Sequence, residues 1–176
     1  MRYAVALASV LLLSACGKSY SDLESAFGTT KIGPASRLSA DSIVLTSQRH
    51  PGAESYRGIA SIYLSPEAVQ IEVSAPFTKP VSIPVQEIAA CAMTCFGYSD
   101  RHVDLLIPKV GVSVMIRESK ELLDWCWNAK RPMAPGAVKR DWAYNRVPLP
   151  PASTFEHQFQ SRAAYDHQTK QRCLGY

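Results

Sequence analysis

The sequence predicts a mostly β domain of the α+β class: an antiparallel, seven-stranded barrel or meander that is closed by one C-terminal helix. Two patterns lead to this prediction. Between residues 41 and 116, short apolar runs alternate with polar residues and are separated by turn residues, which is typical of half-buried strands. After residue 118 the apolar residues recur with the period of a helix. The 176 residues are 47% hydrophobic and 19% charged, and this composition excludes a chain that is disordered throughout.

The expected strands are bounded by glycine, proline or other turn residues. Ile62 and Leu64 share a face of one strand, and Val69 and Ile71 share a face of the next, so we expect these two strands to pair as a hairpin. No helical pattern interrupts the strands, which favours a mostly antiparallel sheet. We expect strands over residues 41–48, 56–64, 69–74, 81–85, 87–96, 102–107 and 112–117.

The closing helix is expected over residues 119–130, which contain neither glycine nor proline. Leu122 and Cys126 lie four residues apart and therefore share one stripe of this helix. Ser119 is a residue type that caps the start of a helix, and Pro132 ends it.

Seven strands followed by an amphipathic helix resemble the pleckstrin-homology superfold, and within it the bacterial GRAM-like domains. The segments that carry this resemblance are Ile62-Tyr63-Leu64-Ser65 leading into Val69-Gln70-Ile71, Ile83-Pro84-Val85-Gln86-Glu87-Ile88, and Glu121-Leu122-Leu123-Asp124-Trp125. The resemblance implies a scaffold for binding and no specific ligand.

The N-terminal residues predict the cellular location of the protein. Arg2 precedes an apolar stretch from Ala4 to Leu13 that is about 15 Å long as a helix, or half the thickness of a bilayer core. This length predicts a targeting segment rather than a transmembrane helix. The residues that follow, Leu13-Ser14-Ala15-Cys16, resemble the lipobox of bacterial lipoproteins at all four positions. The alternative is an ordinary cleaved secretory signal in which Cys16 is incidental.

The lipobox resemblance implies cleavage after Ala15, a diacylglycerol on the sulfur of Cys16, and a further acyl chain such as palmitate on its amino group. Gly17 stands where an aspartate would resemble an inner-membrane retention signal of enteric bacteria. The resemblance therefore implies a periplasm-facing lipoprotein of the outer membrane, with the inner membrane as the alternative. Several acyl chains hold a protein on a membrane durably, at about 0.8 kcal/mol per buried CH₂.

These patterns divide the chain into four segments. We expect a lipoprotein signal peptide over 1–15, a lipidated tether over 16–38 and the pleckstrin-homology or GRAM-like domain over 39–131. A proline-rich extension follows over 132–176, and a capping box at Ser153 predicts a second helix within it.

Apart from Cys16, the chain contains Cys91, Cys95, Cys126 and Cys173. Four cysteines in an oxidising compartment predict up to two disulfides. On a regular strand Cys91 and Cys95 would be roughly 13 Å apart, whereas a disulfide needs Cα atoms about 4.4–6.8 Å apart. We therefore expect a disulfide from one of these two to Cys126 or Cys173. The alternatives are a turn that joins Cys91 to Cys95, free buried thiols, and a metal site at Cys91-x3-Cys95.

The densest polar cluster contains His102 and Asp104, which share one face of a strand. An acid beside an imidazole can orient it for catalysis, so a hydrolase that uses these two residues is the alternative function. We prefer a solvated strand face, in which case replacing both residues with alanine leaves function unchanged. The sequence contains no Gly-x-Ser-x-Gly turn or glycine-rich phosphate loop, and we expect no catalytic residue, cofactor or metal site.

The net charge of +4 is spread along the chain, which argues against a nucleic-acid partner. Taken together, the patterns predict a lipid-anchored bacterial envelope protein that acts as a non-catalytic binding or structural module. Its expected partners are the membrane, through the lipid at Cys16, and a protein whose identity the sequence does not give. One form of this function is an immunity lipoprotein that neutralises a toxin acting in the periplasm.

Overall fold

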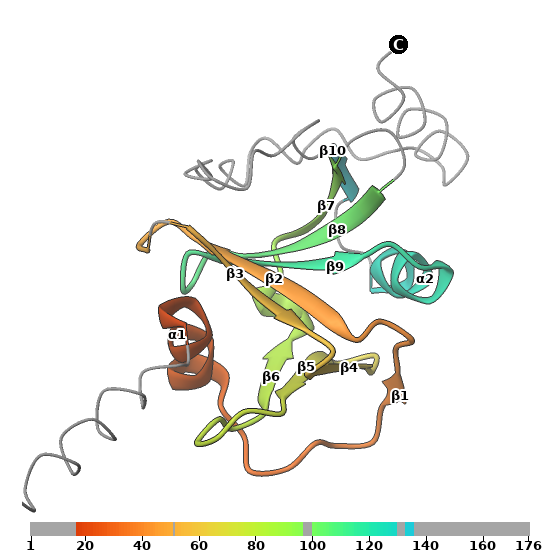
Figure 1. Cartoon of the computed structure of the whole chain (residues 1–176). Helices are drawn as coiled ribbons and strands as arrows, with labels where there is room; N and C mark the ends of the chain where they lie inside the picture. The colour runs from red at the N-terminus through yellow and green to blue at the C-terminus, as the bar shows by residue number, and fades with distance from the viewer. Residues whose placement is uncertain (1–16, 51, 97–99, 130–132, 136–176) are drawn as a thin grey trace, which may run out of the picture.

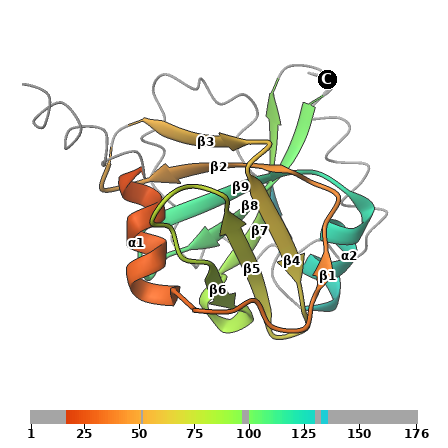
Figure 2. The ribbon, with the colours of Figure 1, turned by 60° about the horizontal axis from the view of Figure 1, so that its bottom comes forward.

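Two β-sheets pack against each other, with one helix on each side of the molecule (Figures 1 and 2). The computed structural model describes residues 17–50, 52–96, 100–129 and 133–135. The helices are Lys18–Phe27 (α1) and Lys120–Asn128 (α2), and Val85–Glu87 (η1) forms a 3-10 turn. The strands are Ser36–Arg37 (β1), Ser42–Ser47 (β2), Ala53–Arg57 (β3), Ala60–Leu64 (β4), Ala68–Val73 (β5), Val81–Pro84 (β6), Ala90–Phe96 (β7), Asp100–Ile107 (β8), Val112–Arg117 (β9) and Met133–Pro135 (β10).

The smaller sheet has the order β1-β4-β5-β6 and the larger one the order β10-β7-β8-β9-β2-β3. Neighbouring strands are antiparallel except for β10, which pairs in parallel with β7. The predicted β-rich α+β class is confirmed, and so is the β4–β5 hairpin, in which Ile62 lies opposite Ile71. The described strands form two open sheets, where the sequence predicted a barrel or a single meander.

The described residues form ten strands, whereas the sequence predicted seven. Gly58 accounts for the largest difference, because the single strand expected over 56–64 is divided there. β3 ends at Arg57 and belongs to the larger sheet, while β4 starts at Ala60 and belongs to the smaller one. Gly58 has a φ of 69°, a left-handed conformation that glycine adopts without a steric penalty. The chain therefore turns from one sheet to the other at this residue.

The core lies between the two sheets and consists mainly of aliphatic side chains from both of them, together with buried residues of the two helices. On β8, Val103, Leu105 and Ile107 are fully buried in this core, so the residues between them face the other side of the larger sheet. From the smaller sheet, Ile62 and Ile71 enter the same core. This packing of strand faces holds the two sheets together, since burial of apolar surface is the main stabilising term in folding.

Helix α1 begins within the segment that we expected to be a tether over 16–38. Tyr20 and Leu23 are fully buried, and the ring of Tyr20 packs against that of Tyr56 on β3 with centroids 5.7 Å apart. The helix Lys18–Phe27 is therefore part of the folded domain. None of the helices in the described residues is long and apolar enough to span a membrane.

The N-terminal cap of helix α1 comes from a side chain of strand β3. The side chain of Glu54 on β3 accepts hydrogen bonds from the backbone N–H of Ser19 at 2.8 Å and of Tyr20 at 3.3 Å. These are two of the N–H groups that have no partner inside a helix. Gly17 permits this close approach, because a Cβ atom there would lie 2.0 Å from the Glu54 carboxyl group. The cap comes from a residue 35 positions away, so a local sequence pattern does not reveal it.

A disulfide joins Cys91 on β7 to Cys126 on α2, with the Cα atoms 6.3 Å apart. This confirms the expected long-range pairing and excludes the alternative in which Cys91 bonds to Cys95. β7 is a continuous strand from Ala90 to Phe96, as the geometric argument required. Cys16, Cys173 and the helix expected after Ser153 lie outside the described residues.

Candidate functional site

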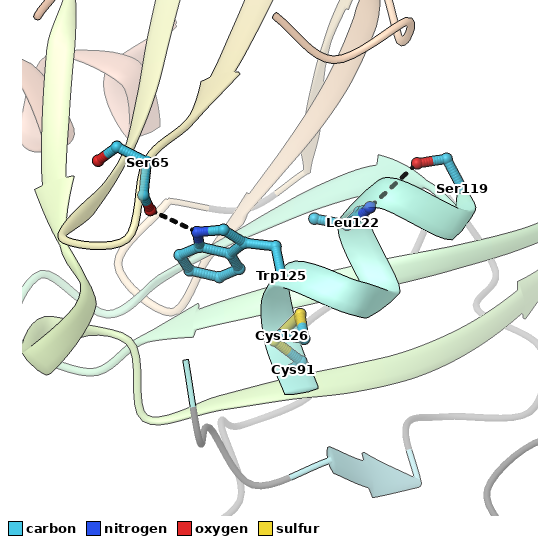
Figure 3. Close-up of a disulfide and its surroundings, with 6 residues drawn as sticks. All are labelled: Ser65, Cys91, Ser119, Leu122, Trp125 and Cys126. Carbon is cyan, nitrogen blue, oxygen red and sulfur yellow. Dashed lines mark hydrogen bonds between the residues drawn. A yellow bond between two sulfur atoms is a disulfide. The ribbon is translucent and has the colours of Figure 1, made fainter. Parts of the chain in front are cut away.

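Helix α2 is attached to both sheets at adjacent residues. Cys126 forms the disulfide with Cys91 of the larger sheet. The indole N–H of Trp125 donates a hydrogen bond of 2.6 Å to the carbonyl oxygen of Ser65, in the turn between β4 and β5 of the smaller sheet (Figure 3). Both side chains are buried. The position of α2 is therefore fixed relative to both sheets.

The local sequence shapes both partners of this contact. Ser119 caps α2 as predicted, because its hydroxyl oxygen accepts a hydrogen bond from the N–H of Leu122 at 3.2 Å. In the β4–β5 turn, the hydroxyl oxygen of Ser65 accepts from the N–H of Ala68 at 3.0 Å. The N–H of Ser65 also donates to the carbonyl of Ala68 at 2.9 Å. These bonds orient the turn so that the Ser65 carbonyl faces Trp125.

A hollow of about 410 Å³ lies between α2, the β4–β5 turn and β1, and we call it the α2 groove. Its apolar lining comes from Leu64, Pro66, Trp125 and Ala129, and its polar lining from Ser36, Ser65, Glu121, Asp124 and Asn128. A cavity of this size, with a few polar groups on an apolar surface, is typical of sites that bind a small ligand or a short segment of another protein.

The polar side of the α2 groove carries negative charge. Hydrogen bonds from its own backbone N–H and from the Ser119 side chain lower the pKa of Glu121, so this carboxylate is ionised at neutral pH. Asp124, one helical turn further, forms an ion pair with Lys120 at 2.7 Å. Lys120 offsets the charge of Asp124, so the two carboxylates and this lysine leave a net negative charge beside the apolar surface, an arrangement that suits a cationic group next to an apolar one.

The two tryptophans of α2 differ in exposure. Trp125 is 9% exposed, whereas Trp127 is 37% exposed. Two residues apart on a helix, they point in directions that differ by about 200° and do not share a face. Trp127 therefore adds an exposed aromatic side chain to the helix that lines the groove.

Asp104 corrects the expectation of a solvated strand face. It is fully buried, and its carboxylate accepts a hydrogen bond of 3.1 Å from the hydroxyl of Thr94, which is also fully buried. His102 is half-buried and lies opposite Thr94 in the pairing of β8 with β7. β8 is an interior strand with β7 and β9 on its two sides, and its polar residues are consequently not at an exposed edge. His102 and Asp104 both take part in further interactions.

Phe77 is an exposed aromatic residue that the sequence analysis did not single out. Its side chain is 85% exposed and its φ is 63°, a left-handed conformation that is uncommon for a bulky residue. The next residue, Thr78, holds the loop through hydrogen bonds from its hydroxyl to the carbonyl oxygens of Val73 and Ala75. Phe77 lines a hollow of about 420 Å³ beside the C-terminal end of α1. The signal in the sequence was an aromatic residue between Pro76 and Pro80, where no strand is expected.

Comparisons of the chain with protein-family models, with curated proteins and with solved structures gave no match. The features that indicate a function are therefore the lipobox, the α2 groove and the placement of His102 and Asp104.

The buried pair of Asp104 and Thr94 yields a prediction about stability. Asp104→Ala removes the acceptor of the buried Thr94 hydroxyl, which should lower the free energy of unfolding by about 1–3 kcal/mol. The matched control is Asp41→Ala, because the Asp41 side chain is exposed. Urea unfolding of both variants measures the difference. An Asp104→Ala variant as stable as Asp41→Ala would contradict the buried hydrogen bond.

Proposed function

We propose that this chain is a bacterial envelope lipoprotein, anchored through Cys16, that acts as a non-catalytic binding module and holds a protein partner in the α2 groove. The observation that carries the proposal is the groove itself, an apolar hollow with two carboxylates on a helix that is fixed to both sheets. A rigid site of this kind loses little conformational entropy when it binds a partner.

The lipobox residues support the anchor, and the disulfide supports the compartment. Leu13-Ser14-Ala15-Cys16 directly precedes the first residue that the structure describes. Disulfides such as Cys91–Cys126 persist in oxidising spaces, of which the periplasm is one. We infer a periplasm-facing location on the outer membrane, with the inner membrane as the alternative.

A GRAM-like scaffold is part of the proposal. Two packed, mostly antiparallel sheets followed by the amphipathic helix α2 support it, as do the three segments that carry the resemblance. In this interpretation α2 is the closing helix of the domain, and the groove lies beside it.

The charge of the groove defines the chemistry of the partner. Glu121 and Asp124 favour a segment that presents lysine or arginine, while Trp125 and Pro66 favour an adjacent apolar side chain. A basic segment of a toxin that acts in the periplasm fits this description, so an immunity lipoprotein is the form of the function that we favour.

The placement of Asp104 favours binding over the hydrolase that the sequence left as an alternative. A catalytic acid or base must reach the substrate within hydrogen-bond distance. Asp104 is fully buried and accepts a hydrogen bond from Thr94, and this placement supports a structural role for the pair.

The anchor is tested by Cys16→Ser. A serine hydroxyl cannot form the thioether with diacylglycerol, so this variant should remain unprocessed or become soluble. Membrane fractionation and intact-mass measurement of both proteins give the result. A variant that still fractionates with membranes at the mass of the processed wild type would overturn the lipoprotein assignment.

The groove is tested by removing its two negative charges. Glu121→Gln with Asp124→Asn should reduce capture of the partner from solubilised envelopes about tenfold or more, because at least one charged contact is lost. The matched control is Glu67→Gln with Asp41→Asn, since both side chains are exposed and outside the groove. Equal recovery of the same partner by the two double variants would show that the groove does not hold it.

A further inference from the structure

The proposed lipid-bearing residue lies next to a part of the chain that is fixed to the domain. Only Gly17 separates Cys16 from Lys18, the first residue of α1. The N–H of Gly17 donates a hydrogen bond of 3.2 Å to the hydroxyl of Tyr56. Neighbouring Cα atoms are about 3.8 Å apart. The residue that would carry the lipid is therefore one peptide unit from Gly17, which is a fixed point of the domain.

Contacts of helix α1 and of strand β3 hold the chain in place at Gly17. On the α1 side, Tyr20 and Leu23 are fully buried in the core. On the β3 side, Glu54 accepts hydrogen bonds from the first turn of the helix, and Tyr56 donates to Glu54 at 3.2 Å. Among the described residues only Gly17 precedes the helix, so no stalk in this part of the chain would separate the domain from acyl chains on Cys16.

Two exposed cationic residues belong to this region of the chain: Lys18 directly follows Gly17, and Arg49 directly precedes His50, whose ring lies 3.2 Å from Asp22 of α1. Two acidic side chains lie nearby, and each contacts a group of the domain. Asp22 lies 3.2 Å from the ring of His50, and Glu54 accepts hydrogen bonds from α1. We call Gly17, Lys18, Arg49 and His50 the anchor face. Its exposed cations complement the phosphate groups of anionic lipids.

We propose that the domain rests directly on the bilayer through the anchor face, with Lys18 and Arg49 against anionic headgroups. This inference rests on the proposed lipid at Cys16 and adds to it a defined orientation. Helix α1 and helix α2 lie on different sides of the molecule in both views (Figures 1 and 2). An anchor face at the start of α1 thus leaves the α2 groove turned toward the periplasm, where a soluble partner can reach it.

The orientation is tested by photo-crosslinking of the full, lipidated chain. p-Benzoylphenylalanine replaces Gln48, an exposed residue beside the anchor face, or Asn128, which lines the α2 groove. Each protein is reconstituted in vesicles of phosphatidylethanolamine and phosphatidylglycerol, and lipid adducts are counted by mass spectrometry. We expect at least about five times more adduct at position 48 than at position 128. A ten-residue glycine-serine insert between Cys16 and Gly17 should abolish this difference.

The lipid contacts also depend on charge. Lys18→Glu with Arg49→Glu should reduce the adduct at position 48 at least twofold, and replacing phosphatidylglycerol with phosphatidylcholine should have the same effect on the wild-type chain. Equal adduct at positions 48 and 128, on a chain whose mass shows the lipid at Cys16, would overturn the orientation alone. A chain without lipid mass on Cys16 would overturn the anchor, and the orientation with it.

Discussion

The disulfide between Cys91 and Cys126 and the hydrogen bond from Trp125 to Ser65 fix adjacent residues of α2 to different sheets. The disulfide spans 35 residues, and in the chain-entropy model closing such a loop is worth roughly 4 kcal/mol. The indole hydrogen bond also orients the β4–β5 turn, because the Ser65 carbonyl must face Trp125 to accept it. Together the two contacts hold α2, which lines the α2 groove, against both sheets, and so the binding function that we propose depends on them.

The proposed membrane contact and the proposed partner site lie on different sides of the domain. At the start of α1, Gly17 and the cap from Glu54 hold the chain against the domain, next to the residue that would carry lipid. At the other side, α2 presents a groove with the carboxylates of Glu121 and Asp124. A protein anchored at one side and binding at the other can hold a partner close to the membrane. This arrangement agrees with a module that intercepts a cationic protein in the periplasm.

Local patterns in the sequence were sufficient for most of the strands and for α2 with its Ser119 cap, since period and capping act over a few residues. Strand length was sufficient to predict a long-range disulfide from Cys91 or Cys95 to Cys126 or Cys173, but not which of these cysteines pair. Local patterns did not reveal the division at Gly58, because alternation continues across it and only the left-handed φ shows the change of sheet. Of the site, the sequence pointed to Cys126 but not to the contact of Trp125 with Ser65, which are 60 positions apart. The burial of Asp104 also depends on sheet order, which no local pattern contains.

The proposed binding function requires that α2, which is joined to both sheets, shapes the groove. Hydrogen–deuterium exchange of the wild type and of a Cys91→Ala, Cys126→Ala variant tests this requirement most directly, under conditions in which both remain folded. Loss of the disulfide should speed exchange in α2 and in residues 65–68 of the β4–β5 turn, because the indole contact loosens with the helix, while α1 keeps its protection. Unchanged exchange in residues 65–68 would show that the turn is ordered independently of α2, and would contradict a groove shaped by this helix.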